Sequence, residues 1–424
     1  MNLNRYNQFP NYIKHHDIYD MLKCIVTILI GFFILIIPFP YNTSTQEILF
    51  YFSVGIAIFL IIRRQTLFSL KSPFTIPFVL FSFWILLCIP FALNKSNSFH
   101  DFYVHLIKHL VMFYILSTYF VSKRLFVVLC WIIVISITFF SFGGTIYYYV
   151  IKGASFQDRF GLPEIGVDIN HIGFLVAPAL FITIALFADS TSVVKKLFLF
   201  LSMISTLSAI VLSGTKGALL GVIVPATFLF TKHKKIIMVA LLCLLLLIII
   251  SPFKNKLHVH AIENAVGAEV ETIRFSIWHD YLQIVKKYPV GGIGYGMQSY
   301  NRDLFNRNNF KFPNIANSKN GTAFFMPHNT LVDLAVRTGI VGVCFFLYCL
   351  YMFFRIGWLL YKDKKDGFTS NWALCLMACC LSLLIQGMFA DLMIGIQIIY
   401  LFVFFAMMNI LWQIKMKDNN LSKQ

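Results

Sequence analysis

The chain has 424 residues, of which 58% are hydrophobic and 12% charged, and its mean hydropathy is +0.76. That much apolar surface does not fit one aqueous core, so the composition excludes an ordinary soluble protein and indicates a polytopic membrane protein. The formal net charge is +17 at pH 7, but no basic patch with interleaved aromatic residues accompanies it. We therefore infer no nucleic-acid partner.

A helix needs roughly 20 apolar residues to cross the hydrocarbon of a bilayer. By this measure the sequence predicts an all-α polytopic membrane protein with about twelve transmembrane helices. They fall near residues 21–40, 47–62, 73–93, 103–121, 125–150, 171–188, 197–213, 217–231, 236–252, 329–355, 371–390 and 392–413. Polar residues precede the first apolar run and many runs follow it, so it is predicted to be a first span and not a cleaved signal peptide.

Lys and Arg in short loops stay on the cytoplasmic side. They recur here in every second connection and in the C-terminal tail, for example at Lys123, Lys195 and Lys415. Both termini are therefore expected in the cytoplasm. The predicted organisation is nine spans in residues 1–252, one large outer loop in 253–328, and three spans with a cytoplasmic tail in 329–424.

The outer loop from Phe253 to Pro327 holds nine basic and five acidic residues, an excess of four positive charges. On the outer side topology does not demand positive charge, so the excess indicates an anionic ligand. The alternative is a solvated loop beside anionic lipid.

Within this loop, residues 272–287 have apolar side chains at 273, 277, 281 and 284, the spacing of an amphipathic helix. We expect this helix to lie along the membrane surface. Arg274 precedes Trp278 by four residues, so the two can share a face. The four glycines of the following segment, Tyr288–Gly296, permit tight turns or close approach to a ligand, although such a segment is also typical of a flexible turn.

The loop ends at Pro327-His328-Asn329, where an apolar helix begins. An imidazole at the mouth of a spanning helix can remove a proton from an attacking hydroxyl at neutral pH. The alternative is an ordinary interfacial histidine at a helix start. Asn329 would help to fix that start, and Gly339-x-x-Gly342 would let another helix pack closely.

Three further basic residues are candidates on the outer side. Lys216, in the turn Ser213–Gly217, precedes a helix N-terminus, which is a natural place to hold phosphate. Arg159 lies in a short loop, and an ordinary solvated charge is an equally good interpretation of it. Lys108 falls within the fourth span; a charge there is a functional candidate because it is costly to bury, unless it snorkels to the surface.

No metal or cofactor site is predicted. The nine cysteines fall inside apolar spans, where they serve as small apolar fillers, and none lies in the large outer loop. No CxxC pair has metal-ligand spacing, and His258-x-His260 stands alone. Walker, dinucleotide and GxSxG motifs are absent from the sequence.

Two segments carry a resemblance to a known family. Ser213-Gly214-Thr215-Lys216-Gly217-Ala218-Leu219-Leu220, and His328-Asn329 followed after nine residues by Gly339-x-x-Gly342, resemble the two signatures of the bacterial O-antigen ligase and polymerase superfamily. The run from Arg274 to Gly296 is similar as well. The spacing from His328 to Gly342 resembles the ligase branch in particular. The resemblance covers Arg159 to Gly342 in motifs and the whole chain in topology.

The resemblance implies a glycosyltransferase of the bacterial inner membrane that acts on the periplasmic face without nucleotide or metal. The donor would be an undecaprenyl-diphosphate-linked O-antigen glycan, and the acceptor a sugar hydroxyl of lipid A-core, among membrane lipids. By position, His328 would activate the acceptor hydroxyl and Arg274 would stabilise the diphosphate leaving group. Lys216 stands where the family usually has arginine. The lysine keeps the positive charge but lacks the planar guanidinium fork. Lys108 and Arg159 match basic positions around the diphosphate.

Two alternatives remain open. An O-antigen polymerase would use the same donor with a second lipid-linked glycan as acceptor, and often has two sizeable outer loops. A lipid-glycan flippase would spread polar residues through the span centres, with repeated halves, whereas here they gather at one face.

Overall fold

The computed structural model describes residues 18–39, 43–66, 69–156, 158–227, 238, 268–300, 326–363, 366–393 and 395–421. These residues form helices and one isolated β-bridge, between Leu162 and Val167, which confirms the predicted all-α class. Eight helices among them are long and apolar enough to cross a membrane. They are α1 (Ile18–Ile36), α2 (Thr43–Ile62), α6 (Lys123–Ile146, continued by a π-helical turn), α7 (Ile169–Asp189), α8 (Val193–Ser213), α13 (Thr330–Lys362), α14 (Gly367–Gly387) and α15 (Gly395–Leu421).

The other predicted spans correspond less closely to the helices of the structure. Helix α3 (Thr75–Cys88) is apolar but shorter than a full span. Of the predicted span 217–231 the structure describes residues 217–227, which belong to the apolar helix Lys216–Thr227. The predicted span 103–121 belongs to a longer run of helix that begins with the polar α4 (Lys95–Phe102) and ends with α5 (Lys108–Tyr119). Of the predicted span 236–252 the structure describes only residue 238, so the total of twelve stays a prediction. Of the predicted outer loop, the structure describes residues 268–300 and 326–328.

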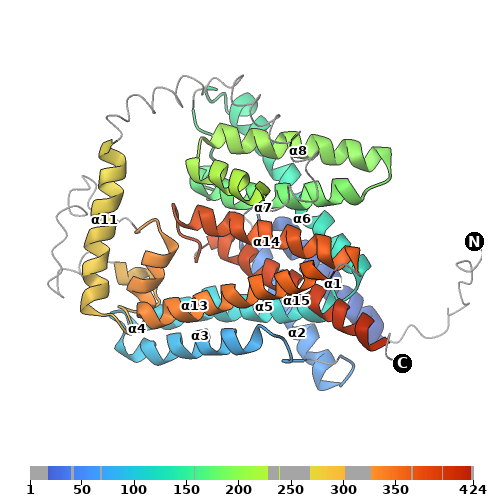
Figure 1. Ribbon diagram of the computed structural model, residues 1–424, viewed down its shortest axis with the longest axis horizontal. Helices are drawn as coiled ribbons and strands as arrows, with labels where there is room; N and C mark the ends of the chain where they lie inside the picture. The colour runs from blue at the N-terminus through green and yellow to red at the C-terminus, as the bar shows by residue number, and fades with distance from the viewer. Residues whose placement is uncertain are drawn as a thin grey trace, which may run out of the picture.

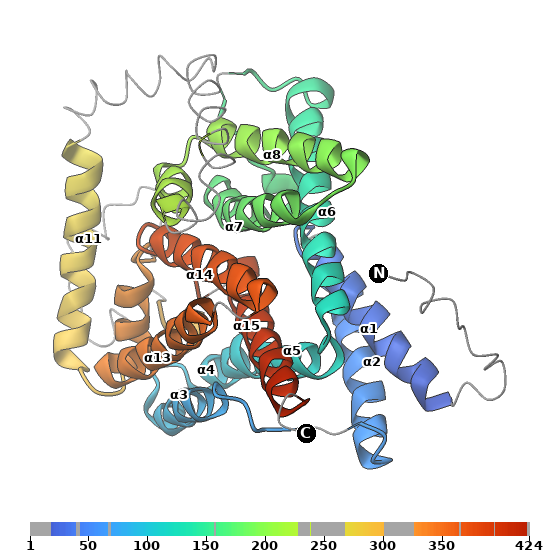
Figure 2. The same cartoon turned by 45° about the vertical axis from the view of Figure 1, so that its right-hand side comes forward.

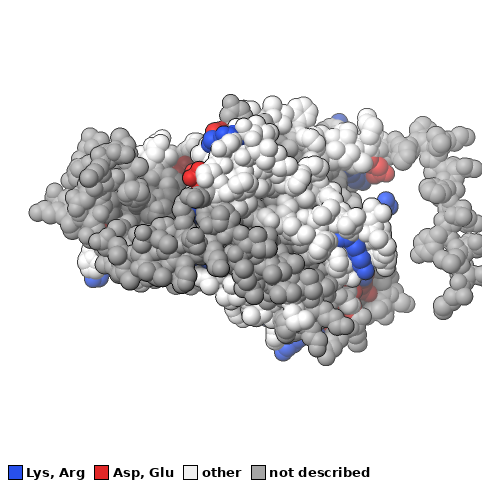
Figure 3. Space-filling model, turned by 90° about the horizontal axis from the view of Figure 1, so that it is seen from above, with Lys and Arg blue, Asp and Glu red and all other residues white. Residues whose placement is uncertain are grey.

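Aromatic packing joins helices that are distant in the sequence. The ring of Phe74, just before α3, lies 5.9 Å from that of Phe113 on α5 and 5.2 Å from that of Phe405 on α15. Phe353 on α13 lies 5.1 Å from Phe405. In another layer, α7 lies between α8 and α14 (Figures 1 and 2). On the face shown in Figure 3, most of the described residues are uncharged.

Charged contacts tie together the connections that were expected to share the cytoplasmic side. Lys123, at the start of α6, lies 3.4 Å from Asp366 and 3.2 Å from Asp418. Lys415 on α15 lies 2.6 Å from Asp363, just after α13. The C-terminal end of α15 lies at the opposite end of the bundle from helix α11 (Ala268–Lys287), which runs across the other helices (Figure 1).

Candidate functional site

Helix α13 begins at a side-chain cap. The Asn329 Oδ1 accepts hydrogen bonds from the backbone N–H groups of Leu331 (3.0 Å) and Val332 (3.2 Å), the usual role of an N-cap asparagine. Its Nδ2 donates to the carbonyl of Met388 at 3.4 Å. Asn329 therefore both starts α13 and contacts the connection between α14 and α15.

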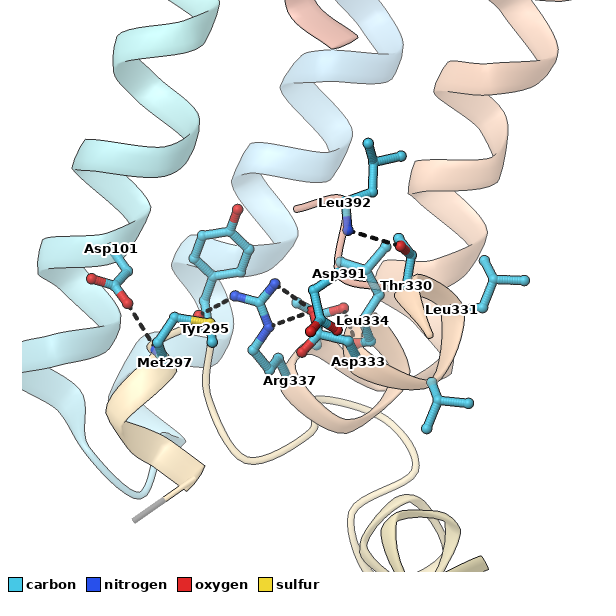
Figure 4. Close-up of polar contacts among 12 residues, drawn as sticks. Asp101, Tyr295, Met297, Thr330, Leu331, Asp333, Leu334, Arg337, Asp391 and Leu392 are labelled. Atoms are coloured by element: carbon cyan, nitrogen blue, oxygen red, sulfur yellow. Dashed lines mark hydrogen bonds and ion pairs between the residues drawn. The ribbon is translucent and has the colours of Figure 1, made fainter. Parts of the chain in front are cut away.

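Thr330 fastens the same connection from the first turn of α13. Its hydroxyl accepts a hydrogen bond from the N–H of Leu392 at 3.0 Å (Figure 4) and donates to the carbonyl of Ala390 at 3.3 Å. Asp391 lies between these two anchored residues. Its position relative to α13 is thus fixed by backbone contacts on both sides.

His328 and Asp391 face each other across this junction. The His328 Nδ1 lies 3.6 Å from Asp391 Oδ2, an ion-pair distance that is too long for a hydrogen bond. The His328 side chain is 37% exposed, whereas that of Asp391 is 8% exposed. Asp391 Oδ1 has no hydrogen-bond partner among the described residues. A partly exposed imidazole therefore stands beside a buried carboxylate.

The backbone at His328 is strained. Its φ of 48° is in the left-handed region, which costs a non-glycine residue about 1–2 kcal/mol. Such strain persists only when the surroundings hold it, and it gathers at functional sites. Here the N-cap of Asn329 holds the chain on one side. On the other, Trp278 of α11 donates its Nε1–H to the carbonyl of Pro327 at 2.7 Å.

Helix α11 packs on the first half of α13 through the predicted apolar face. Ile277, Tyr281 and Ile284 are buried in a cluster that also contains Val336 of α13. Arg274 lies one turn before Trp278 on the same helix, and its side chain lies outside the described part of the chain. The structure thus places the α11 backbone beside the residue that precedes His328.

Gly339 interrupts α13. Its φ of 71° and ψ of 179° are not helical, so the nine residues from Thr330 to Thr338 form a separate half-helix. The carbonyls of Val336, Arg337 and Thr338 then accept bonds from outside the helix, namely from Ile293 N (2.8 Å), Gly294 N (3.1 Å) and Trp84 Nε1 (2.9 Å). The nine-residue spacing of the motif is the length of this half-helix.

The neighbours of Gly339 differ from those expected. A Cβ at Gly339 would overlap the backbone of Val290 and Gly291, so the close approach is to the glycine-rich segment after α11 and not to another helix. Ile340 N also donates to the carbonyl of Pro289 at 2.8 Å. Gly342 does face a helix, since its Cβ would lie 3.4 Å from Trp84 Cδ1 of α3.

Arg159 and the turn Ser213–Gly217 lie together. The Arg159 Nε donates to the Ser213 carbonyl at 2.8 Å, and Phe160 N donates to the Leu212 carbonyl at 2.9 Å. Lys216 is exposed at the start of the helix Lys216–Thr227, and its side chain makes no hydrogen bond or ion pair with any described residue. The structure confirms that a helix begins at this turn, and an anion at Lys216 stays a prediction.

The same turn reaches the connection that carries Asp391. A Cβ at Gly217 would lie 3.5 Å from Phe389, two residues before Asp391. The short connection Met388–Met393 thus contacts the Lys216 turn through Phe389 and His328 through Asp391. The structure brings the two sequence motifs to one place.

Lys108 is positioned differently from the other candidates. It forms an ion pair with Glu47 of α2 and lies over the rings of Phe50 (5.7 Å) and Tyr51 (5.5 Å). It lines a cavity of about 140 Å³ that extends to Gly395, the first residue of α15. No contact joins Lys108 to Arg159, Lys216 or His328 within the described residues.

Asp391 is the functional candidate that sequence reasoning missed. A signal was present, because Asp391 is the only acidic residue between Asp366 and Asp418, in a strongly apolar stretch where a charge is costly. The partner of that charge could not be read from the sequence. No group of three or more His, Cys, Asp or Glu side chains in the described ranges could hold a metal ion.

Residues 198–347 match a family model described as O-Antigen ligase. The matched range contains both motifs, from the Lys216 turn to Gly342, and it ends within α13. No curated protein matches the chain.

Proposed function

We propose that this chain is an O-antigen ligase. The match of residues 198–347 supports a member of the O-antigen ligase/polymerase superfamily. The proposed ligase would transfer an undecaprenyl-diphosphate-linked O-antigen glycan to a sugar hydroxyl of lipid A-core. Enzymes of this family are glycosyltransferase-like and act on lipid-linked O-antigen glycans. The observation that supports the proposal most is the convergence of the Lys216 turn, Asp391 and His328 at one short connection.

In the proposed reaction the acceptor hydroxyl oxygen attacks the anomeric carbon of the donor glycan. The bond from that carbon to the diphosphate oxygen breaks, and undecaprenyl diphosphate leaves with the bonding electron pair. His328 takes the hydroxyl proton. Since Nδ1 faces Asp391, the Nε2 atom is the one free to accept it, and the carboxylate stabilises the imidazolium that forms.

Cations would stabilise the diphosphate as its negative charge develops. Lys216 is suited to this role because it is exposed, unpaired with any described residue, and at a helix N-terminus. Arg159 contacts the same turn through its hydrogen bond to the Ser213 carbonyl. Arg274 is proposed to approach from α11, and Lys108 would contribute only if it left Glu47.

The proposed location is the inner membrane, with the site on the periplasmic face and both termini in the cytoplasm. The ion pairs at the opposite end of the bundle join loops that are rich in Lys and Arg, as the positive-inside rule expects of a cytoplasmic side.

A gene deletion tests the ligase proposal. Lipopolysaccharide from the deletion strain would be compared with that of the complemented strain on silver-stained gels and anti-O blots. Bare lipid A-core, with O-glycan accumulating on undecaprenyl diphosphate, is expected of a ligase. Core carrying a single repeat unit would instead identify a polymerase, and unchanged full-length ladders would contradict both.

Asp391→Asn is expected to slow glycan transfer about 100-fold, because a neutral amide no longer stabilises the protonated imidazole of His328. The rate would be measured with purified protein, lipid-linked donor and lipid A-core. Glu164→Gln removes an exposed carboxylate that pairs with Lys152, and this control should leave the rate unchanged. An unchanged rate in Asp391→Asn would remove Asp391 from the proposed mechanism.

Lys216→Met is expected to lower the rate of transfer about 10- to 100-fold, whereas Lys216→Arg should retain it, because an anion at this helix N-terminus requires the positive charge. Lys195→Met, at an exposed lysine of α8, provides the matched control. Equal rates in Lys216→Met and wild type would show that the diphosphate does not contact this turn.

A further inference from the structure

The half-helix of α13 contains a buried ion pair, Asp333–Arg337. The side chains are 1% and 0% exposed, and both Arg337 Nε (3.0 Å) and Nη2 (2.7 Å) donate to Asp333 Oδ2. Because Arg337 is fully buried, it does not present its charge to a substrate. Burying two charges is also costly, and hydrophobic side chains of similar volume often stabilise a protein as well or better. Stability alone therefore gives a weak reason for this pair.

The remaining hydrogen-bonding groups of the pair contact one segment, residues 295–300 after the glycine-rich turn. Arg337 Nη1 donates to the Tyr295 carbonyl at 2.8 Å, and the guanidinium lies 4.8 Å from the centre of the Tyr295 ring (Figure 4). The Tyr300 hydroxyl donates to Asp333 Oδ1 at 2.6 Å. The pair thus holds this segment at both ends.

Helix α4 holds the middle of the same segment. The N–H groups of Gly296, Met297 and Gln298 donate to side-chain oxygens at 3.2, 2.8 and 2.8 Å. These acceptors are Ser98 Oγ, Asp101 Oδ2 and Asn97 Oδ1. Figure 4 shows Asp101 and Arg337 on opposite sides of the segment.

This segment follows α11 closely in the chain. Only Tyr288–Gly294 separates them, and Ile293 and Gly294 are themselves bonded to carbonyls of the half-helix. The C-terminal end of α11 is therefore fixed to the element whose N-terminus follows His328. Trp278 supplies the second attachment, at Pro327.

We propose that Asp333–Arg337 is a positioning pair, which fixes segment 289–300 on the half-helix and so sets the placement of α11, with Arg274, relative to His328. Its role in catalysis rests on the proposed function. Its role in fixing the segment does not, since that is a property of the folded chain. Hydrogen bonds from a planar guanidinium are directional, so they fix one arrangement of the pair and the segment. An apolar contact does not fix one arrangement.

The test replaces the pair with apolar residues of similar size, Arg337→Met with Asp333→Leu. Amide hydrogen exchange of peptides covering 289–300 would be followed by mass spectrometry in the full-length, detergent-solubilised protein. We expect faster exchange in this segment. We also expect kcat to fall about 100-fold, because small misplacements of catalytic groups are costly, with a smaller change in the KM for donor. The thermal midpoint should change little.

The matched control removes a partly buried ion pair at the far end of the bundle, by Lys415→Met with Asp363→Leu. It should leave exchange in 289–300 and kcat unchanged. Tyr300→Phe removes one hydroxyl and leaves the ion pair intact, so it serves if the double variant does not fold. It is expected to raise exchange near residue 300 and to lower kcat by a smaller factor.

Two results would overturn the proposal: unchanged exchange in 289–300 when the pair or the Tyr300 hydroxyl is lost, or faster exchange with an unchanged kcat. If the wild-type protein shows no transferase activity, the proposed function fails. The exchange data would still decide whether the pair fixes the segment.

Discussion

His328→Ala is expected to abolish detectable glycan transfer, with a loss of about 10²- to 10⁴-fold in rate, because the proposed base is removed. Asp391, Lys216 and Arg159 would remain in place, so the variant removes only the imidazole that lies 3.6 Å from Asp391. In a deletion strain, His328→Ala should give bare lipid A-core on silver-stained gels. With purified protein it should give no ligated product above background.

His279→Ala is the matched control for this experiment. His279 lies on α11 near Asp280, with its Nδ1 3.8 Å from Asp280 Oδ1, and its side chain is 71% exposed, so it resembles the His328–Asp391 pair outside the site. Its loss should leave full-length ladders. The amount and thermal midpoint of the His328→Ala protein should match wild type. Ladders restored by His328→Ala would exclude this histidine as the base.

Gly339→Ala is expected to destabilise the protein by about 2–5 kcal/mol and to abolish transfer, from left-handed strain of about 1–3 kcal/mol together with overpacking. A Cβ at this position meets the backbone of Val290 and Gly291, which cannot move aside as the end of a flexible side chain can. The glycine-rich segment would have to leave the half-helix, and the carbonyls of Val336 and Arg337 would lose their hydrogen-bond donors. The thermal midpoint and the yield of folded protein measure this effect.

Gly55→Ala provides the control, because a Cβ on Gly55 of α2 has no atom within 4 Å and its backbone is helical. That variant should fold and transfer as wild type does. A Gly339→Ala protein with a wild-type thermal midpoint would show that the break in α13 is not required by the fold.

Much of the class and of the local structure could be predicted from the sequence. Apolar runs near the required length recur as helices, because hydropathy over a run of about 20 residues is a local property. The amphipathic spacing of α11 is also local, and Ile277, Tyr281 and Ile284 are buried as it predicts. The two motifs on which the family resemblance depends both lie within the matched range, 198–347.

Only part of the half-helix could be predicted from the sequence. The distance from Asn329 to Gly339 was visible, but a Gly-x-x-Gly pattern is also typical of close helix packing. Only the backbone conformation of Gly339 distinguishes a helix break from close helix packing, since a residue with a φ of 71° cannot continue a helix. Asp333 and Arg337 have the spacing of an ordinary exposed i,i+4 pair, and the packing of Tyr295 and Tyr300 buries them.

The sequence by itself determined that this is a helical membrane protein, where most spans lie, and that His328, Arg274 and Lys216 are the residues to test. These conclusions follow from composition, short-range spacing and a motif. The tertiary structure decided that Asp391 faces His328, that the Lys216 turn contacts Phe389, and that an ion pair joins α13 to the segment after α11. Such contacts join distant parts of the chain, and they depend on how separate helices pack, which no local pattern of residues specifies.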